Sequence, residues 1–466
     1  MPRYTGGMTT KTTPPDGNDR PPAGRDMGPN TAVIGDIEQF LVAALVEMEP
    51  LPAVYPHQPR GRPRILPALA LWGGLLVCVL QGWTTQSALW RLLTQRQLWF
   101  FPRFTVSDQA VYHRLERDGA APLERVFAHI TQVLRERLAP FMQARLASFA
   151  TEVIALDQVK LDQVARSLPA LQGVPAGDDR LLPGAFGVLF DVRRQQFRTV
   201  EYHADPHQNE KVAARDLAAT LPHGSLVLAD LGYFSFPWFD WLHDHGLWWI
   251  SRLRAKTSYT VRHIFYQQDG VLDALVDLGA YRADRAAYRV RLVAFRVGAK
   301  EHRYLTSVLD PRLLPIRDIA QLYARRWDIE MAFNLLKTHL GLHLLWSAKP
   351  VVILQQVWAA LVIAQVLQAL RVEIAGRAGV DVFDVSLPLL VQYAPQYGYD
   401  GKDPVAAFVE HGRAAGFIRP SRRIRLQVPE APPEAIIPLP AGLGLERTPR
   451  YAGRKAGSRT SAKDQS

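Results

Sequence analysis

The chain has 466 residues, enough for two to four domains with at least one large core. Apolar residues make up 48% and charged residues 21%, which excludes global disorder, collagen and coiled coil as the main architecture. Cys78 is the single cysteine, so the chain forms no intramolecular disulfide and no cysteine-based zinc finger, and a reducing cytoplasm suits it. Residues 1–32 are rich in Pro, Gly, Thr and Asp, which predicts a disordered leader.

The net charge of +11 is unevenly distributed. Residues 411–466 hold eleven Lys or Arg against four Asp or Glu. We expect a basic, largely disordered tail that binds a polyanion, most often nucleic acid. A tail that only improves solubility is the alternative.

Two uncharged apolar runs raise the question of a membrane. Ile65–Leu80 is short and holds Pro67 and two glycines, and Val351–Leu370 holds four glutamines. A spanning helix needs about 20 predominantly apolar residues. Both runs are therefore expected as buried helices, and a membrane protein is kept as the less favoured reading.

Residues 33–148 predict a helical region with few strand signals. Thr84–Gln95 and Ser107–Leu115 are two short helical stretches, and Ser107 suits the N-cap of the second. Two readings stay open here: a reader of the helix-turn-helix type that binds DNA, or a helical domain without that role.

Residues 149–254 alternate strand and helix signals, as in an α/β domain. Two short apolar strands end at Asp157 and Asp230, and the full predicted order is strand Thr151–Leu156, strand Ala185–Val192, strand Phe197–His203, helix Asn209–Thr220, strand Ser225–Ala229, helix Pro237–His245 and strand Leu247–Leu253. This order predicts a mixed sheet with helices packed on it. Ligands bind at the rim where strands of such sheets end, so both aspartates are candidate site residues.

Residues 255–311 alternate Val, Tyr and Phe with Arg and His, which predicts a β-rich insertion. Residues 312–410 then predict the second part of this α/β domain and C-terminal helices. Asp318–Leu340 is expected as one long helix that ends at Gly341, and Val351–Gly376 as another.

The long helix carries a polar stripe beside its apolar face. At about 100° per residue, Tyr323, Arg326, Glu330 and Lys337 fall within a stripe of about 60° that borders the apolar side chains. Trp327 points away from it and is expected in the core. Intrahelical ion pairs such as Arg326–Glu330 are one explanation. The other is a site in which Glu330 binds a hard cation while Arg326 and Lys337 hold phosphate oxygens.

Three carboxylates on neighbouring elements, Asp157, Asp230 and Glu330, would make an all-oxygen site. Such ligands suit Mg²⁺, with Mn²⁺ as a substitute. Two ions about 3.5–4 Å apart activate a water or a 3′-hydroxyl and stabilise the leaving oxygen in phosphodiester chemistry.

The spacing Tyr323-x2-Arg326-x3-Glu330-x6-Lys337 resembles the DDE transposases of bacterial insertion sequences, in the group defined by that motif. Ala229-Asp-Leu-Gly-Tyr-Phe-Ser235 resembles the second-Asp motif of that family, and the strand Trp249–Arg254 resembles the one that follows it. The family commonly has Asp-x-Thr-Thr-Leu-Asp at its first motif. This chain has Asp157-Gln-Val-Lys-Leu-Asp162 instead, which makes Asp162 a substitute candidate.

The resemblance implies a ribonuclease H-like catalytic domain and a function in cut-and-paste transposition: Mg²⁺-dependent DNA cleavage at transposon ends and strand transfer into target DNA. Asp157, Asp230 and Glu330 would be the catalytic metal ligands, and Tyr323, Arg326, Lys337 and Arg252 would contact DNA. The expected partners are double-stranded DNA and a second copy in a synaptic homodimer, and the expected place is the bacterial cytoplasm, at the nucleoid. A catalytically inactive transposase-derived DNA-binding protein or repressor is the alternative.

Overall fold

The structure is a computed structural model that describes residues 37–48, 65–83, 85–160, 173–175, 184–204, 210–279, 284–342, 347, 349–399, 403–421 and 428–449. The expected leader, Asp162 and most of the loop between the first two strands lie outside the described residues.

Within that part of the chain, nine strands form one mixed sheet in the order β3-β2-β1-β4-β5-β9-β8-β7-β6. Their bounds are β1 Val153–Lys160, β2 Ala185–Asp191, β3 Gln196–His203, β4 Leu226–Ala229, β5 Trp248–Arg252, β6 Tyr259–Gln268, β7 Val271–Leu278, β8 Val290–Val297 and β9 Lys300–Thr306. β1, β4 and β5 run parallel, and the other neighbours pair antiparallel. The expected mixed α/β fold is confirmed.

Helices lie on both faces of this sheet. The main ones are α1 Ile37–Met48, α2 Ala68–Leu80, α3 Gln86–Gln95, α4 Asp108–Asp118, α5 Ala121–Arg137, α7 Glu210–Ala218, α8 Phe236–Asp244, α9 Ile316–Arg325, α10 Trp327–Asn334, α11 Pro350–Ala378, α12 Leu387–Tyr399 and α13 Pro404–His411. Ser107 caps α4 as expected, because its hydroxyl accepts a hydrogen bond from the Ala110 amide at 3.2 Å.

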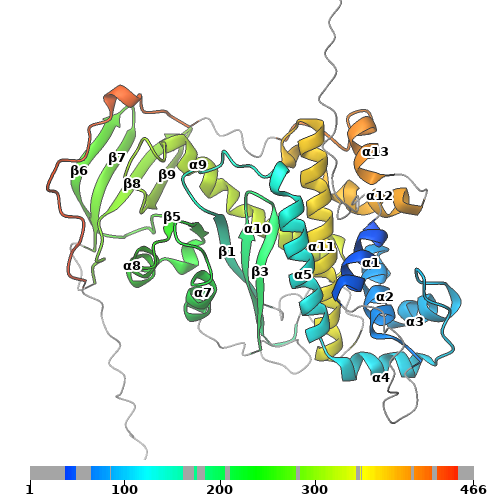
Figure 1. Cartoon of the computed structure of the whole chain (residues 1–466). Coiled ribbons are helices and arrows are strands. Elements are labelled where there is room, and N and C mark those ends of the chain that lie inside the picture. The colour runs from blue at the N-terminus through cyan, green and yellow to red at the C-terminus, as the bar shows by residue number, and fades with distance from the viewer. Residues whose placement is uncertain are drawn as a thin grey trace, which may run out of the picture. The chain divides into compact units, whose positions relative to one another are not determined.

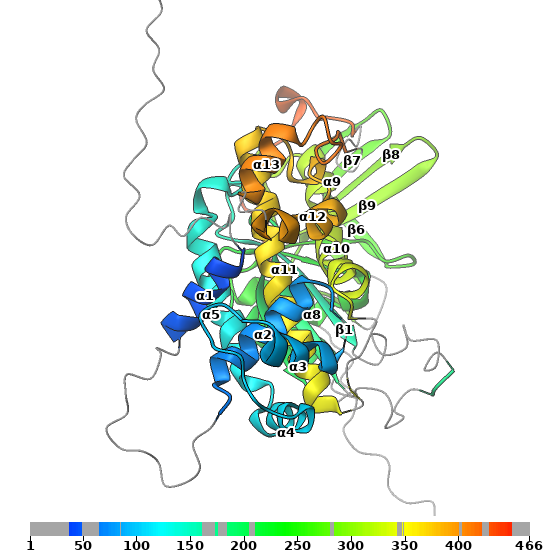
Figure 2. The same cartoon turned by 90° about the vertical axis from the view of Figure 1, so that its right-hand side faces the viewer.

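Strand alternation separates two hydrophobic cores. Val153 and Ala155 of β1 point into the core that holds α5, α10 and α11, whereas Ile154 and Leu156 point into the core under α7 and α8. The first core also contains the apolar side chains of α1 to α5. The N-terminal helices therefore share one packed interior with the sheet (Figures 1 and 2).

Helix α11 lies in the middle of the helical part (Figure 2). It is long and apolar enough to cross a membrane, but 83% of its most apolar window is buried inside the protein. Two of its glutamines bond to main-chain groups of other elements: Gln365 accepts from the Phe197 amide at 2.9 Å and donates to the Phe197 carbonyl at 2.8 Å, and Gln355 donates to the Leu115 carbonyl. A helix whose polar side chains bond to main-chain groups of neighbouring elements in this way is typical of a protein interior.

The region 255–311 extends the sheet of β1 to β5 instead of forming a separate one. β9 pairs with β5, and β8, β7 and β6 follow it outward (Figure 1).

The C-terminal residues 428–449 lie against this outer part of the sheet, so the expectation of a largely disordered tail does not hold for them. Ile437 donates to the Phe265 carbonyl, and the Arg447 amide donates to the Ala287 carbonyl. Asp277 is buried and accepts hydrogen bonds from Arg262 and Arg289, which lower its pKa although burial acts to raise it.

A buried ion pair joins the outer strands to the start of α9. Arg291 donates to both oxygens of Asp273 at 2.7 and 2.6 Å and to the Leu314 carbonyl at 2.7 Å. The side chains of Arg291 and Asp273 are 0% and 1% exposed.

Replacing Arg291 with methionine leaves the Asp273 charge buried without its partner. We expect a loss of about 3–5 kcal/mol in the free energy of unfolding, measured by urea denaturation. Arg303→Met is the matched control, because its ion pair with Glu301 on β9 is 47% and 43% exposed and should cost at most about 1 kcal/mol. Equal losses in the two variants would contradict this account.

Candidate active site

Asp157 and Asp230 stand next to each other at one edge of the sheet. β1 and β4 are parallel, and their last paired residues are Leu156 and Ala229, so the two aspartates are the next residues in the same register. Asp157 was expected just past the end of its strand. It lies inside β1 instead, because β1 continues to pair with β2, where Asp157 lies opposite Val188.

Glu330 approaches this edge from the face that the aspartates share with Ala155. α10 packs on β1, and Ile329 and Phe333 beside Glu330 belong to the same core as Ala155. Parallel strand pairing and helix packing thus bring together three carboxylates that lie far apart in the sequence.

Arg326 joins two of these carboxylates. Its guanidinium lies 2.8 Å from Glu330 Oε1 and 3.8 Å from Asp230 Oδ1, and its side chain is 5% exposed. Burial alone would lower the pKa of Arg326, but the hydrogen bond to Glu330 and the charge of Asp230 raise it above its ordinary value. The expected ion pair Arg326–Glu330 is therefore present, and the same guanidinium also lies near Asp230 at the sheet edge.

The pKa of Asp157 is raised to about 6, mainly by burial. The hydrogen bond from the Gln158 amide and the charge of Arg326 act to lower this pKa, and the negative charges of Glu330 and Asp230 act to raise it. Three acidic side chains therefore repel one another at one place, which is the electrostatic character of a cation site. Among the described residues, however, no three His, Cys, Asp or Glu side chains lie close enough to share a metal ion. The ligand types fit Mg²⁺, but the side chains are not already gathered around one point.

Tyr323 is buried one helical turn before Arg326. Its hydroxyl has no hydrogen-bond partner among the described residues, and burial raises its pKa to about 12. Arg252, the exposed last residue of β5, acts on the same hydroxyl through its positive charge.

Lys337 lies in a π-helical turn, η4 Leu335–His339, that follows α10. The sequence predicted one uninterrupted helix from Asp318 to Leu340, whereas the structure has α9, α10 and this wider turn in succession. π-turns often occur at functional sites. Burial lowers the pKa of Lys337, and the negative charge of Asp157 acts to raise it, which indicates that Lys337 belongs to the same site.

The expectation that Trp327 lies in the core is wrong. Its side chain is 53% exposed, and the Arg326 guanidinium lies over its ring at 5.2 Å. The buried face of this helix is narrower than its periodicity predicts, because Met331, one turn after Trp327, is also exposed.

Sequence reasoning missed two groups that hold the site in place. Arg325 and Asp328 form a buried ion pair at 2.6 Å, and Gln195 of the β2–β3 turn donates to Asp328 at 2.7 Å. The i, i+3 spacing of Arg325 and Asp328 is typical of an ion pair on one helix and could have predicted this contact. Tyr304 packs its ring 5.3 Å from that of Tyr323 and pairs with Arg252 across β9 and β5. No sequence pattern gives that register.

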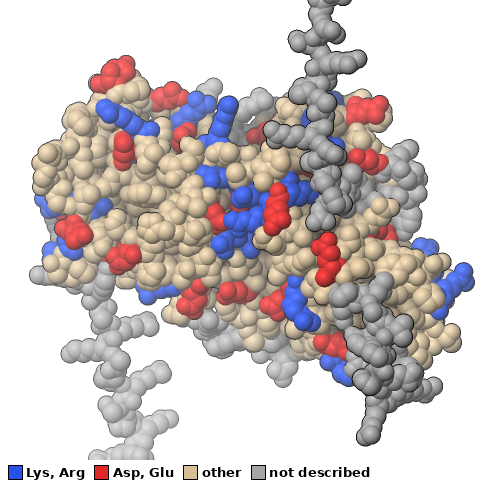
Figure 3. Space-filling view, in the orientation of Figure 1, with Lys and Arg blue, Asp and Glu red and all other residues tan. Residues whose placement is uncertain are grey.

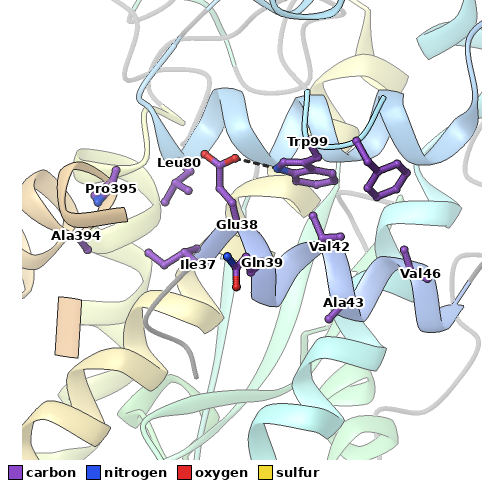
Figure 4. Close-up of a pocket in the computed structure, with 11 residues that line it drawn as sticks. Ile37, Glu38, Gln39, Val42, Ala43, Val46, Leu80, Trp99, Ala394 and Pro395 are labelled. Atoms are coloured by element: carbon purple, nitrogen blue, oxygen red, sulfur yellow. Dashed lines mark hydrogen bonds between the residues drawn. The ribbon is translucent and has the colours of Figure 1, made fainter. Parts of the chain in front are cut away.

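A cavity with mainly apolar walls lies away from these carboxylates. It measures about 530 Å³ and lies between α1 and the turn that holds Trp99. Its walls are mainly apolar, and Glu38 accepts a hydrogen bond from the Trp99 indole at 2.8 Å (Figure 4). It offers no cluster of charges for phosphate or metal, so the candidate active site is the carboxylate edge.

Asp157→Asn should stabilise the protein in the absence of metal, in a manner that depends on pH. The raised pKa means that the folded protein gains stability from protonated Asp157 at low pH and loses it as the pH rises through about 6. We expect equal stability of variant and wild type near pH 4 and a gain of about 1–3 kcal/mol for the variant at pH 8, measured by urea denaturation. Asp216→Asn on the exposed side of α7 is the control, and a gain that does not vary with pH would contradict the assignment.

Comparison with known proteins identifies this region. The family described as "Transposase DDE domain" matches residues 187–366. That range contains Asp230, Glu330 and the remainder of the polar stripe, and Asp157 lies before it.

The transposase for insertion sequence element IS231E of Bacillus thuringiensis subsp. finitimus is 29% identical over 86 residues. This match covers 18% of the present chain and 18% of that protein's own length. Among solved structures, a piggyBac transposase synaptic complex with hairpin DNA, determined by cryo-EM, is similar with a TM-score of 0.39 and 9% identity, over 86% of this chain and 85% of that one. At this TM-score the likeness carries no conclusion about the fold.

The family match includes the α9–α10 segment, which carries the motif spacing. The chain therefore carries a transposase DDE domain and is related to the DDE transposases of insertion sequences.

Proposed function

We propose that this protein cleaves phosphodiester bonds at transposon ends and joins them to target DNA in a reaction that depends on divalent metal. The observation that carries the proposal is that Asp157 and Asp230 lie in register at one sheet edge and that Arg326 joins Asp230 to Glu330 there, so that Asp157 is affected by the charges of both other carboxylates. The order β3-β2-β1-β4-β5, antiparallel and then parallel, supports the ribonuclease H-like description.

Asp157, Asp230 and Glu330 would hold Mg²⁺, or Mn²⁺ in its place, and the bound metal would supply activation of the attacking oxygen and stabilisation of the leaving one. While no metal is bound, Arg326 balances the charge of Glu330 and Asp230. Once these carboxylates have another cation, the guanidinium is available to a phosphate.

Lys337 would hold a second phosphate as a point charge, because it lies near Asp157 and is only half-buried. The Tyr323 hydroxyl, which is buried without a hydrogen-bond partner in the described chain, would donate to a backbone oxygen. Arg252 at the end of β5 would extend the same path along the DNA.

The proposed partners are double-stranded DNA, with the helical region 33–148 and the basic tail contributing to its binding, and a second copy in a synaptic homodimer. Nucleoid association follows from that substrate. A catalytically inactive DNA-binding protein is the second candidate, favoured by the altered first motif, Asp157-Gln-Val-Lys160, and by the absence of three gathered ligands among the described residues.

Glu330→Gln separates the two candidates. An amide is a poor Mg²⁺ ligand, so we expect binding of DNA that carries the element's own ends to be nearly unchanged and cleavage to be lost. Cleavage of such a fragment by wild type and variant, with and without Mg²⁺, is the measurement. The inactive-copy reading gains if the wild type binds these ends but never cuts them, and equal loss of binding and cleavage in the variant would count against a metal role for Glu330.

Lys337→Ala should weaken DNA binding in a way that depends on salt. One phosphate contact contributes about 0.9 to the slope of log K against log salt on duplex DNA, so the slope should become shallower by about that amount. Fluorescence anisotropy over a series of salt concentrations measures it. Lys300→Ala, on the exposed start of β9, is the control, and an unchanged slope in Lys337→Ala removes this residue from the DNA path.

A further inference from the structure

Four arginines surround one buried carboxylate in the outer part of the sheet. Asp277 of β7 is 1% exposed, and the Nε atoms of Arg262, Arg289 and Arg447 lie 2.5, 2.9 and 3.7 Å from its oxygens. Burial lowers the pKa of Arg447, and Asp277 acts to raise it. The positive charges of Arg285, Arg289 and Arg262 act to lower it. These four arginines, the outer arginine cluster, therefore share one negative charge.

Strand alternation keeps the other acidic side chains of this region on the opposite face of the sheet. The Tyr288 hydroxyl donates to Asp244 of α8 at 2.6 Å, which places Tyr288 on the face that α8 covers. Glu446 lies opposite Tyr288 in an antiparallel bridge and shares that face. Asp284 lines a cleft at the N-terminus of α8. Arg289 follows Tyr288 in the chain and points to the other face, so the arginines are separated from these three acids.

The structural role of the cluster does not require Arg262. Arg289 and Arg447 both donate to main-chain carbonyls and also lie next to Asp277. Within the described part of the chain, the one hydrogen bond of Arg262 runs from its Nε to Asp277. Its side chain is 45% exposed. The two terminal nitrogens of this guanidinium remain available as donors, in a fork that matches an oxyanion.

The outer arginine cluster is separate from the carboxylate edge. β5 runs parallel to β4, β9 antiparallel to β5, and β8 antiparallel to β9, so β8 has the direction of β4. Asp230 follows the end of β4, whereas Arg289 precedes the start of β8. The cluster thus lies at the opposite edge of the sheet, and β5 and β9 separate β4 from β8 (Figure 1).

We propose that the outer arginine cluster binds a phosphate group. The terminal nitrogens of Arg262 donate to its oxygens, and its negative charge offsets the positive charges that now act on Arg447. A free phosphate ion and the backbone of DNA both offer this chemistry. The inference goes beyond the proposed function, because binding at this edge requires neither the metal nor the cleavage reaction.

Another group of basic side chains is more evenly balanced. Figure 3 shows Lys and Arg gathered near the middle of one face, beside α5. Around the cleft between α5 and β3, Arg135 and Arg198 pair with Glu152, and Arg194 pairs with Asp191. In the described part of the chain, no more than two guanidiniums share either of these carboxylates, whereas three share the carboxylate of the outer arginine cluster.

Titration with inorganic phosphate tests the proposal, at constant pH and ionic strength and without Mg²⁺ or DNA. The readout is the midpoint of thermal unfolding, which rises as the folded protein binds the anion. Arg262→Gln is the main variant, and Asp277 keeps Arg289 as a partner in it. Arg303→Gln is the matched control, because Arg303 is an outer-sheet arginine that is 47% exposed and pairs with one carboxylate, that of Glu301.

We expect phosphate to raise the midpoint of the wild type and of Arg303→Gln alike. Arg262→Gln should need about tenfold more phosphate for the same rise, because it loses charge-assisted hydrogen bonds to the anion. Each variant is compared with itself in chloride, so a change in basal stability does not affect the result. Identical titrations of the wild type and Arg262→Gln, or no response of the wild type, would overturn the proposal and leave the proposed function intact.

Duplex DNA distinguishes the two sources of the phosphate. If it belongs to DNA, Arg262→Gln should make the slope of log K against log salt shallower by about 0.9, the contribution of one backbone contact. If it is a free ion, the slope should stay unchanged while the phosphate titrations still differ, and either result supports the site. A wild type that binds no DNA would contradict the proposed function and not the phosphate site.

Discussion

The parallel pairing of β1 with β4 is the constraint on which the rest of this molecule depends. It fixes Asp157 and Asp230 in adjacent positions, and alternation along the strands turns both toward the face that α10 covers. Two carboxylates in register repel each other, and Glu330 adds a third. The fold tolerates this repulsion because Arg326, itself buried, lies within 4 Å of two of the three.

This arrangement explains why the polar stripe of the α9–α10 segment lies beside the core and not opposite it. A buried guanidinium without an anion would be costly, and so would the carboxylates without a cation. Each compensates the other while no metal is present. The same logic places Lys337 in a wider π-turn, where its ammonium comes under the influence of Asp157 although the surrounding side chains are apolar.

Much of this could be predicted from the sequence, because local patterns carried it. The strand end before Asp230, the N-cap at Ser107, and the spacing from Tyr323 to Lys337 are short-range signals. The extension of β1 past Asp157 depends on pairing with β2, and the Arg252–Tyr304 register depends on two strands that meet across more than fifty residues. Long-range pairings of this kind leave no periodicity to read.

Other differences have the same origin. Trp327 is exposed because only one flank of the helix meets the sheet, and apolar character alone does not say which flank that is. The contacts of residues 428–449 include main-chain hydrogen bonds to Phe265 and Ala287, which no hydrophobic pattern predicts. Composition suggested a solvated tail there, and hydrogen bonding between distant segments decided otherwise.

The position of these C-terminal residues has a consequence for biosynthesis. Residues 287–289, just before β8, leave the ribosome well before their main-chain partners Leu445 and Arg447 have been translated. Until residue 447 has been translated, Asp277 also lacks the nearby charge of Arg447. A stop codon before residue 437 would leave the Phe265 carbonyl on the outermost strand β6 without the Ile437 amide as its partner and open to pairing with other chains.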